Sequence, residues 1–544
     1  METKKSAYGI LFMAMLLGVV IGLMTAPQLE RLGGGRQSSE VSLTETVEEF
    51  ARLVRENYVD SLDLESDSLT PRMMAAMLAQ LDPHSYYIAP KDAEVKEEMM
   101  NSNFEGIGIG LMYYDDTVFV DEVFDGGPAQ KAGLLSGDRI VRVDTLGVCG
   151  TGITKQENGV ARYIRGPRGT YVKITVQRGE ADEEMSFDVL RDVIHRPTVV
   201  AAQMLDNTTG YIRIYSFSHT TGYEVDNALG KLLKQGMTSL ILDLRDNGGG
   251  ALETALETSQ QFLPKGEKIL YTEGAHQQRR EFYSDGRGLF VEGCLTVMID
   301  EGSASASEIV AGAVQDNDRG LVVGRRSFGK GLVQTLFNMP GGAMMTLTTV
   351  RYYTPSGRCI QRPYNKGSEE YYSDYVMRML VADSVAERMF NTTDTTQVFY
   401  TKKGRKVYGG GGIMPDTVLS DTGDGNWRYY NEVVRAQVIG QCAMDYLHRH
   451  GKQLRSRYPD LEAFIKGFHP DGILQTILKR ADAKGIARDE KGISQHGEEM
   501  GQLFKARLAQ SLYGGDAHYR VINRYDTDLQ KARAINKKQQ LRTI

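Results

Sequence analysis

Cysteine is scarce in this sequence of 544 residues, and no two cysteines form a CxxC pair. The four that occur are widely spaced: Cys149, Cys294, Cys359 and Cys442. This spacing indicates neither a zinc site nor a disulfide framework, although pairing in an oxidising compartment stays open. The chemistry indicated below needs no metal or cofactor, and we expect none.

Histidine is also sparse, because the chain has nine histidines at scattered positions. None stands in a recognisable relation to the serine-rich turn described below, and no GxSxG elbow surrounds the serines of that turn. His448 and His450 lie two residues apart and would face away from each other on a helix, so a metal site there is not expected. A serine nucleophile in this chain would therefore need a base other than imidazole.

An excess of positive charge is missing as well. The chain has 64 basic and 70 acidic residues and a net charge of −6, which gives no reason to expect a nucleic-acid partner. Its hydrophobic content of 41% and charged content of 25% are ordinary for a globular protein. The length predicts roughly two to four domains.

The stretch from Leu295 to Gln334 holds the most informative pattern. An apolar run, LTVMID, leads into a turn of small residues from Glu301 to Glu308, and an apolar helix follows. Such a turn leaves a hydroxyl at a helix N-terminus, where unpaired N–H groups and the helix dipole favour developing negative charge. The pattern fits a serine nucleophile, and it also fits serines that only cap the helix.

Lys330 is the candidate base. It lies in the segment FGKGLVQ, between Gly329 and Gly331 and close to apolar residues. Burial would lower the pKa of its amine until part of it is neutral. Gln334 would share a face with Lys330 on an extended segment and could hydrogen-bond the amine. The alternative is an ordinary exposed lysine.

Three motifs, DLRDNGGG, GSASASEI and FGKGLVQ, follow one another in the chain. Together they resemble the signature of the C-terminal processing proteases, also called tail-specific proteases. The resemblance extends from roughly Val41 to Pro415. It implies that Ser305 is the nucleophile, that Lys330 is its general base and that Gln334 assists the lysine.

Strands alternate with helices over residues 199–350, which predicts an α/β layer with a parallel or mixed sheet. The resemblance implies a ClpP/crotonase-like protease core in this region. It also points to an oxyanion hole formed by the N–H of Ala306 and that of Gly249 or Gly250, although these glycines also fit a structural turn. Family members usually have proline where this chain has Gly248, so we expect a more mobile loop.

Short β runs separated by glycine turns fill residues 104–178 and resemble a PDZ domain. PDZ domains add a peptide strand to a sheet edge and hold its terminal carboxylate on backbone N–H groups. Gly106, Ile107 and Gly108 would supply those groups, since glycine lets the backbone come close. A plain glycine turn is the alternative, and a nucleotide loop is disfavoured because no helix opens after it.

The N-terminus carries Lys4 and Lys5, and about twenty uncharged residues follow, from Ala7 to Ala26. This pattern predicts a membrane-anchoring helix in the inner membrane, with the catalytic part on the periplasmic or extracytoplasmic side. A cleaved signal peptide is the alternative.

We expect an α/β (α+β multidomain) protein with an inserted PDZ domain and helical N- and C-terminal segments. The expected parts are an anchor and linker (1–40), a helical segment (41–102), the PDZ domain (103–182), the protease core (183–420) and a helical extension (421–544). The basic, polar run after Tyr525 is expected to be a frayed end. In proteases of this kind a helical N-terminal segment supports assembly, so a homo-oligomer is possible.

The pattern as a whole predicts a serine endopeptidase of the Ser–Lys type that cuts exported proteins or peptides near their C-termini. The PDZ segment would first bind the free carboxylate of the substrate. One alternative is a catalytically silent PDZ scaffold, which would not need a serine, a lysine and a glutamine together. Another is a crotonase-like acyl-CoA enzyme, which explains neither the PDZ segment nor the anchor.

Overall fold

The computed structural model describes residues 43–59, 69–155, 159–179, 183–380, 397–419 and 427–543. The predicted membrane segment at residues 7–26 lies outside these ranges. Within them, no helix is both long enough and apolar enough to cross a membrane. The chain divides into two compact units, Met1–Met74 and Ala75–Ile544, which are described separately.

The helical segment expected over residues 41–102 begins, in the first unit, with α2, Leu43–Asn57. Arg52 pairs with Glu49 and Glu56 on its surface, one turn away on either side. A second helix of this segment, α3, covers Leu69–Leu78 and runs across the boundary between the two units.

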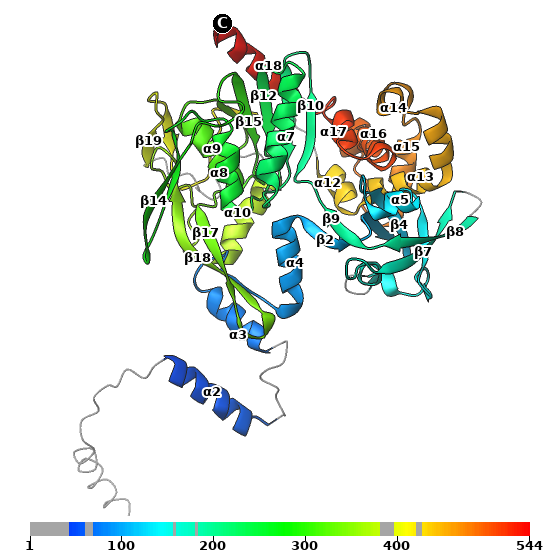
Figure 1. Cartoon of the computed structure of the whole chain (residues 1–544), viewed down its shortest axis with the longest axis horizontal. Helices are drawn as coiled ribbons and strands as arrows, with labels where there is room; N and C mark the ends of the chain where they lie inside the picture. Colours follow the sequence, from blue (N-terminus) through cyan, green and yellow to red (C-terminus); the bar gives the residue numbers. More distant parts are fainter. Residues whose placement is uncertain are drawn as a thin grey trace, which may run out of the picture. The chain divides into compact units, whose positions relative to one another are not determined.

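A six-stranded sheet forms the centre of the second unit (Figure 1). All neighbouring strands are parallel except the first pair, and the order is β10 (Val199–Met204), β11 (Thr209–Ile214), β12 (Ser239–Asp243), β15 (Cys294–Ile299), β16 (Leu321–Gly324) and β21 (Thr417–Val418). Every residue of β12 and β15 is buried, as expected for strands covered on both faces. The predicted α/β layer is confirmed.

The two faces of this sheet are covered by different helices. Leu240 and Leu242 of β12 pack with the helices α7 (Thr221–Lys234), α8 (Leu252–Gln260) and α9 (Ala306–Asp316). Ile241, which points to the opposite face, belongs to a cluster that includes Leu529 of α18, Thr527–Thr543.

The prediction of a frayed end after Tyr525 is therefore wrong. Helix α18 contacts β12, β15 and β16, and its Leu529, Ala532 and Asn536 are fully buried. Figure 1 shows this helix, in red, beside β12 and β15. The polar composition of the segment hid the narrow apolar stripe by which it packs.

A second, antiparallel sheet carries one of the predicted site residues, Gln334. Four of its strands lie in the order β1 (Tyr86–Ile88), β18 (Met344–Tyr353), β13 (Lys268–Gly274) and β14 (Gln277–Tyr283), and β17 (Leu332–Asn338) pairs with β18. The elements α4 (Pro90–Asn101) and α10 (Ser368–Leu380) belong to the same unit, as do the short hairpin strands β19 (Val398–Tyr400) and β20 (Lys406–Tyr408).

The segment expected to be a PDZ domain forms an antiparallel sheet. Its strands are β3 (Ile109–Tyr114), β4 (Thr117–Val123), β5 (Arg139–Val143), β6 (Leu146–Gly147), β7 (Tyr171–Arg178) and β8 (Glu183–Leu190). Strand β8 pairs with β7 along its whole length, so the sheet continues to Leu190, past the boundary expected at residue 182. The strands that flank this sheet in the chain also pair: β2 (Asn103–Gly106) with β9 (Asp192–His195).

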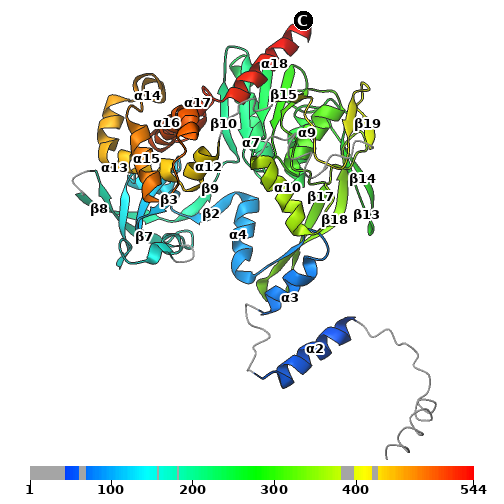
Figure 2. The ribbon, with the colours of Figure 1, turned by 180° about the vertical axis from the view of Figure 1, so that it is seen from behind.

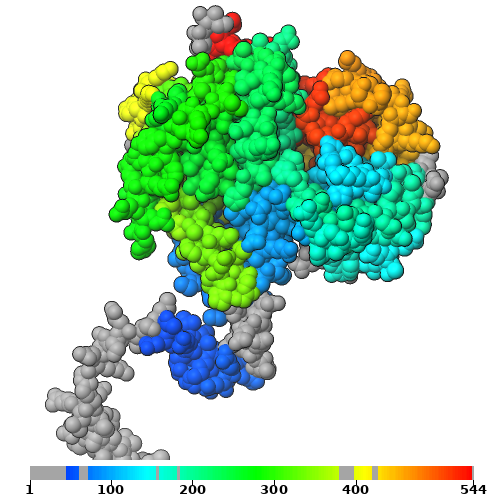
Figure 3. All heavy atoms as spheres, viewed as in Figure 1, coloured from blue at the N-terminus to red at the C-terminus, as the bar shows by residue number. Residues whose placement is uncertain are grey.

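The C-terminal helices pack on this sheet (Figure 2). They are α12 (Arg428–Arg435), α13 (Val438–Arg457), α14 (Leu461–Gly467), α15 (Ile473–Ala483), α16 (Glu490–Tyr513) and α17 (Ala517–Ile522). Phe119 of β4 joins their hydrophobic core, and the Tyr114 hydroxyl donates to Asp445. The space-filling view shows the orange helices directly against the cyan sheet (Figure 3).

Candidate active site

Ser305 lies at the N-cap of α9, where the chain turns out of β15. Its backbone has a positive φ of 54°, which is unusual for a residue other than glycine. Such conformations cost about 1–3 kcal/mol and are found mainly at functional sites. The sequence-based choice of Ser305 thus falls on a strained residue at a helix N-terminus.

Glu308 holds the turn in place and was missed as a site residue by the sequence analysis. Its buried carboxylate accepts hydrogen bonds from the N–H groups of Ser305 (2.8 Å), Gly329 (2.7 Å) and Lys330 (2.9 Å) and from the Ser327 hydroxyl. Burial raises the pKa of Glu308, and the four donors oppose that rise. One side chain therefore joins the turn at residues 300–305, here called the serine loop, to the loop at residues 325–331, here called the lysine loop. The pattern Ser-x-x-Glu of a capping box was the available signal.

Replacing Glu308 by glutamine is expected to lower the free energy of unfolding by about 2–4 kcal/mol and kcat by at least about tenfold. The amide nitrogen cannot accept, so buried donors of both loops lose their partner. Urea unfolding and peptide hydrolysis measure the two effects. The exposed Glu292→Gln is the control, and equal behaviour of the two variants would refute the role of Glu308.

Lys330 lies in the loop between β16 and β17 and shares a groove with Ser305. Burial lowers the pKa of its amine to about 8, and the charge of Lys96 acts in the same direction. Glu308 and Asp82 oppose this shift. A sizeable fraction of the amine is therefore neutral near pH 8, which a general base requires.

Gln334 lies on β17 and lines the same groove. Its amide nitrogen donates to the Thr348 hydroxyl at 3.2 Å, and that hydroxyl donates to Asp82 at 3.1 Å. The register shift beside Gln334 places its extra residue, Thr349, on β18, and Lys330 lies before β17 begins, so strand alternation does not test whether the two side chains share a face. The role of Gln334 in orienting the lysine amine stays a prediction.

The glycine loop before α8 supplies the candidate oxyanion hole. The N–H of Gly249 donates to the side chain of Asn247 at 2.9 Å and is thus engaged. The C=O of Gly249 and the N–H of Ala251 both bond to Phe217, in an arrangement that does not use the Gly250 N–H. Of the two glycines considered, Gly250 is therefore the better candidate.

Close packing explains the glycines at these two positions. A Cβ on Gly249 would lie 2.8 Å from the Cβ of Ser305, and one on Gly250 would lie 1.8 Å from the carbonyl oxygen of Phe217. Larger residues would force the loop away from the serine. The N–H of Ala306, in the first turn of α9, lies directly after the nucleophile candidate.

Gly106 is the last residue of β2, and Ile107 and Gly108 connect it with β3. The C=O of Ile107 accepts from the Ala129 N–H at 2.9 Å, and that of Gly108 accepts from the Phe124 N–H at 3.0 Å. In the described sheet β3 pairs only with β4, so its other edge is open to an added peptide strand.

One groove of about 1380 Å³ contains all the predicted site residues. Its lining includes Gly106, Ile107, Gly108, Gly249, Gly250, Ser305, Ala306, Lys330 and Gln334. Ile109 and Leu111 of β3 line it too. The groove therefore connects the edge of the PDZ-like sheet with the serine and the lysine.

His84 is a second residue of the groove that the sequence analysis did not single out. Its ring nitrogen Nε2 lies 3.1 Å from the Tyr371 hydroxyl, and the residue lines the groove. Burial and the charge of Lys330 lower the pKa of His84 to about 4, so the ring is neutral at physiological pH. Among the described residues, no three His, Cys, Asp or Glu side chains are grouped as metal ligands.

Comparison with known proteins gives matches in three parts of the chain. Residues 208–367 match the model of peptidase family S41, residues 106–189 that of the PDZ domain and residues 429–514 a family of unknown function. The carboxy-terminal-processing protease of Bartonella bacilliformis is 35% identical over 313 residues, which are 57% of this chain and 70% of the relative. The chain belongs to this protease family. It is a serine-type peptidase with a PDZ domain and an S41 core, as the resemblance predicted.

Other members of the family are similar over the same extent. The carboxy-terminal processing protease CtpA of Bacillus subtilis is 32% identical over 310 residues, 57% of this chain and 65% of the relative. The solved structure of a photosystem II D1 C-terminal processing protease is 30% identical, covers 57% of this chain and 83% of its own, and has a TM-score of 0.33. The two curated proteases and the S41 match do not favour the silent-scaffold alternative.

Proposed function

We propose that this protein is a serine endopeptidase that cuts proteins or peptides near a free C-terminus, with Ser305 as nucleophile and Lys330 as general base. The observation that carries the proposal is the single groove joining the PDZ loop to both residues. The substrate carboxylate would bind the N–H groups of residues 106–108. The preceding residues would pair with β3 and reach Ser305.

The chemistry follows from a neutral lysine. The amine of Lys330 takes the proton of the Ser305 hydroxyl as its oxygen attacks the scissile carbonyl. The ammonium then gives this proton to the leaving amine, and an acyl-enzyme ester remains. Water hydrolyses the ester in the same way, with Lys330 again as base.

The negative oxygen of each tetrahedral intermediate needs hydrogen-bond donors. We assign this role to the N–H groups of Gly250 and Ala306, since that of Gly249 is engaged by Asn247. Loss of one such donor costs about 10²–10³ in rate in other proteases. The bonds of Glu308 to Ser305 and Lys330 support this alignment.

Amidation of the substrate C-terminus is expected to raise KM by about 10- to 100-fold and to change kcat little. The reason is that hydrogen bonds to a charged group contribute about 1.5–3 kcal/mol. Steady-state hydrolysis of one unstructured peptide, as the free acid and as the amide, measures the effect. Fluorescence anisotropy with the Ser305→Ala variant measures binding alone, and equal affinity for both peptides would exclude carboxylate recognition.

We further propose that the segment from Ala7 to Ala26 anchors the protein in the inner membrane, with the groove on the extracytoplasmic side. Its uncharged length and the two preceding lysines support this. Resistance of the full chain to alkaline carbonate extraction tests the anchor, and release into the soluble fraction would favour a cleaved signal peptide.

A further inference from the structure

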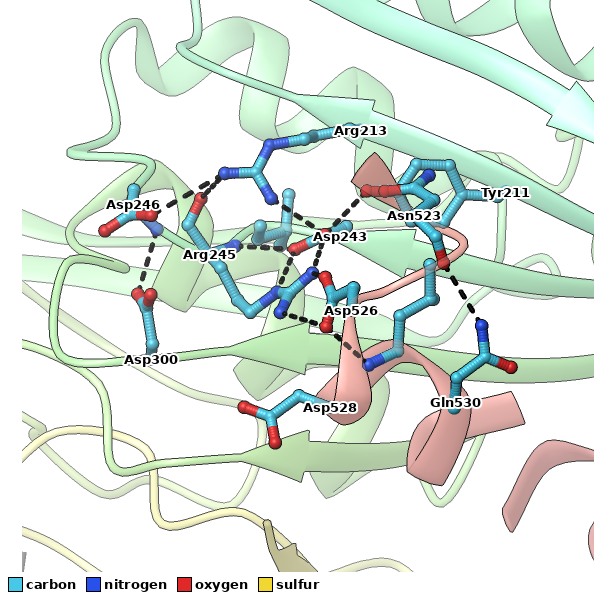
Figure 4. Close-up of polar contacts among 12 residues, drawn as sticks. Tyr211, Arg213, Asp243, Arg245, Asp246, Asp300, Asn523, Asp526, Asp528 and Gln530 are labelled. Atoms are coloured by element: carbon cyan, nitrogen blue, oxygen red, sulfur yellow. Dashed lines mark hydrogen bonds and ion pairs between the residues drawn. The ribbon is translucent and has the colours of Figure 1, made fainter. Parts of the chain in front are cut away.

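Two carboxylates at the start of α18 contact arginines that follow strands of the central sheet. Figure 4 shows the first of these contacts, between Asp526 and Arg245. Asp526 pairs with Arg245, with 2.6 Å between Oδ2 and Nη2. Asp528 pairs with Arg325, with 3.0 Å between Oδ2 and Nη1. Asp526 also caps the helix, since its Oδ1 accepts from the Leu529 N–H at 2.8 Å.

Arg245 lies at the start of the glycine loop, residues 244–251, which connects β12 with α8. Its guanidinium and its backbone N–H both bond to Asp243 at the end of β12. The next residue, Asp246, donates its N–H to Asp300 at 2.9 Å, and Asp300 accepts in turn from the N–H of Gly302. The glycine loop and the serine loop are thus joined directly beside Arg245.

Arg325 lies at the start of the lysine loop and contacts the serine loop. Its Nε donates to Glu301, in the turn that leads to Ser305, at 2.8 Å. Its own N–H donates to the Ile299 C=O at 3.0 Å, and the chain then continues towards Lys330. The arginine therefore links the start of the lysine loop to the start of the serine loop.

The charge balance explains why the core needs a carboxylate from α18. Asp243 is fully buried and faces two guanidinium groups, that of Arg213 at 2.8 Å and that of Arg245 at 2.6 Å. Asp526 supplies the second carboxylate, and the Arg245 side chain is only 12% exposed. Without that charge a nearly buried cation loses a partner, and such a cation tends to move towards water.

We infer that α18 positions the catalytic loops. Asp526 and Asp528 hold in place the starts of the loops that carry Gly250, Ser305 and Lys330. Both are positioning residues that act through Arg245 and Arg325. The helix lies outside residues 208–367, which match the S41 family. The inference rests on the roles proposed above for Ser305 and Lys330.

The test is Asp526→Asn in the full chain. Asparagine caps helices as well as aspartate does, so the variant removes the charge and keeps the cap. Because the donors of the glycine loop lose their alignment, kcat is expected to fall about tenfold while KM stays within about twofold. Asp526→Glu, which returns the carboxylate, should bring kcat back to within about threefold of wild type.

Arg533→Gln is the matched control. It breaks another ion pair of the same helix, at 2.7 Å from Asp206, which lies in the turn between β10 and β11 and not in a catalytic loop. Its kcat should stay within about twofold of wild type. If it loses as much kcat as Asp526→Asn, the helix acts only through general stability and the inference falls.

The other outcomes are equally defined. A folded Asp526→Asn protein with the kcat of wild type would overturn the inference, while loss of activity in a parallel Ser305→Ala sample would leave the proposed function standing. An active Ser305→Ala protein would instead refute the proposed function. If Asp526→Asn does not fold by circular dichroism, Asp528→Asn takes its place, with an expected fall in kcat of about threefold and the same overturning result.

Discussion

Replacing Ser305 by alanine is expected to lower kcat by about 10⁴-fold or more. Without the hydroxyl no acyl-enzyme forms, and the remaining donors act only on direct attack by water. Alanine keeps the Cβ, so the strain of the positive φ at this position is the same in both proteins. Initial rates on an unstructured peptide with a free C-terminus measure the loss.

Ser307→Ala is the matched control for this variant, because it removes another hydroxyl of the same turn. Ser307 donates to the C=O of Asn247 at 2.9 Å, a structural bond whose loss should cost no more than about tenfold in kcat. Peptide binding by Ser305→Ala should equal that of wild type, since the PDZ loop is untouched. Comparable hydrolysis by both variants would show that Ser305 is not the nucleophile.

Replacing Lys330 by alanine is expected to lower kcat by about 10³-fold, within the range known for loss of a general base. Ser305 then keeps its proton at neutral pH and attacks poorly. Lys330→Arg should be equally inactive at every pH, because a guanidinium keeps its charge in proteins. An arginine variant with near-normal kcat would mean that position 330 only supplies positive charge.

The pH dependence follows from the same residue. Only the neutral amine acts as base, and the pKa of Lys330 is lowered to about 8. Activity of the wild type should therefore rise with pH, about tenfold per unit below pH 8, and level off about one unit above it. A profile with its midpoint near 6.5 that persists in Lys330→Ala would point to a histidine instead.

The sequence by itself determined the local parts of this protein. Apolar runs such as the one ending at Asp300 form strands, and small residues followed by an apolar stretch form the turn and the helix at Ser305. These patterns involve residues three or four positions apart, so they can be read along the chain. The choice of Ser305 and Lys330 also depended on the family resemblance, because capping and ordinary exposure explained each residue alone.

Only the tertiary structure decided which groups meet across long stretches of chain. Glu308 bonds to Lys330 across 22 residues, the Gly249 N–H is engaged by a side chain, and Arg245 meets Asp526 across 281 residues. The sequence predicts a frayed end in place of helix α18, because the apolar stripe of this segment is narrow and its charges suit solvent. Those charges have partners only after the sheet has brought the ends of β12, β15 and β16 together, and no local pattern contains that information.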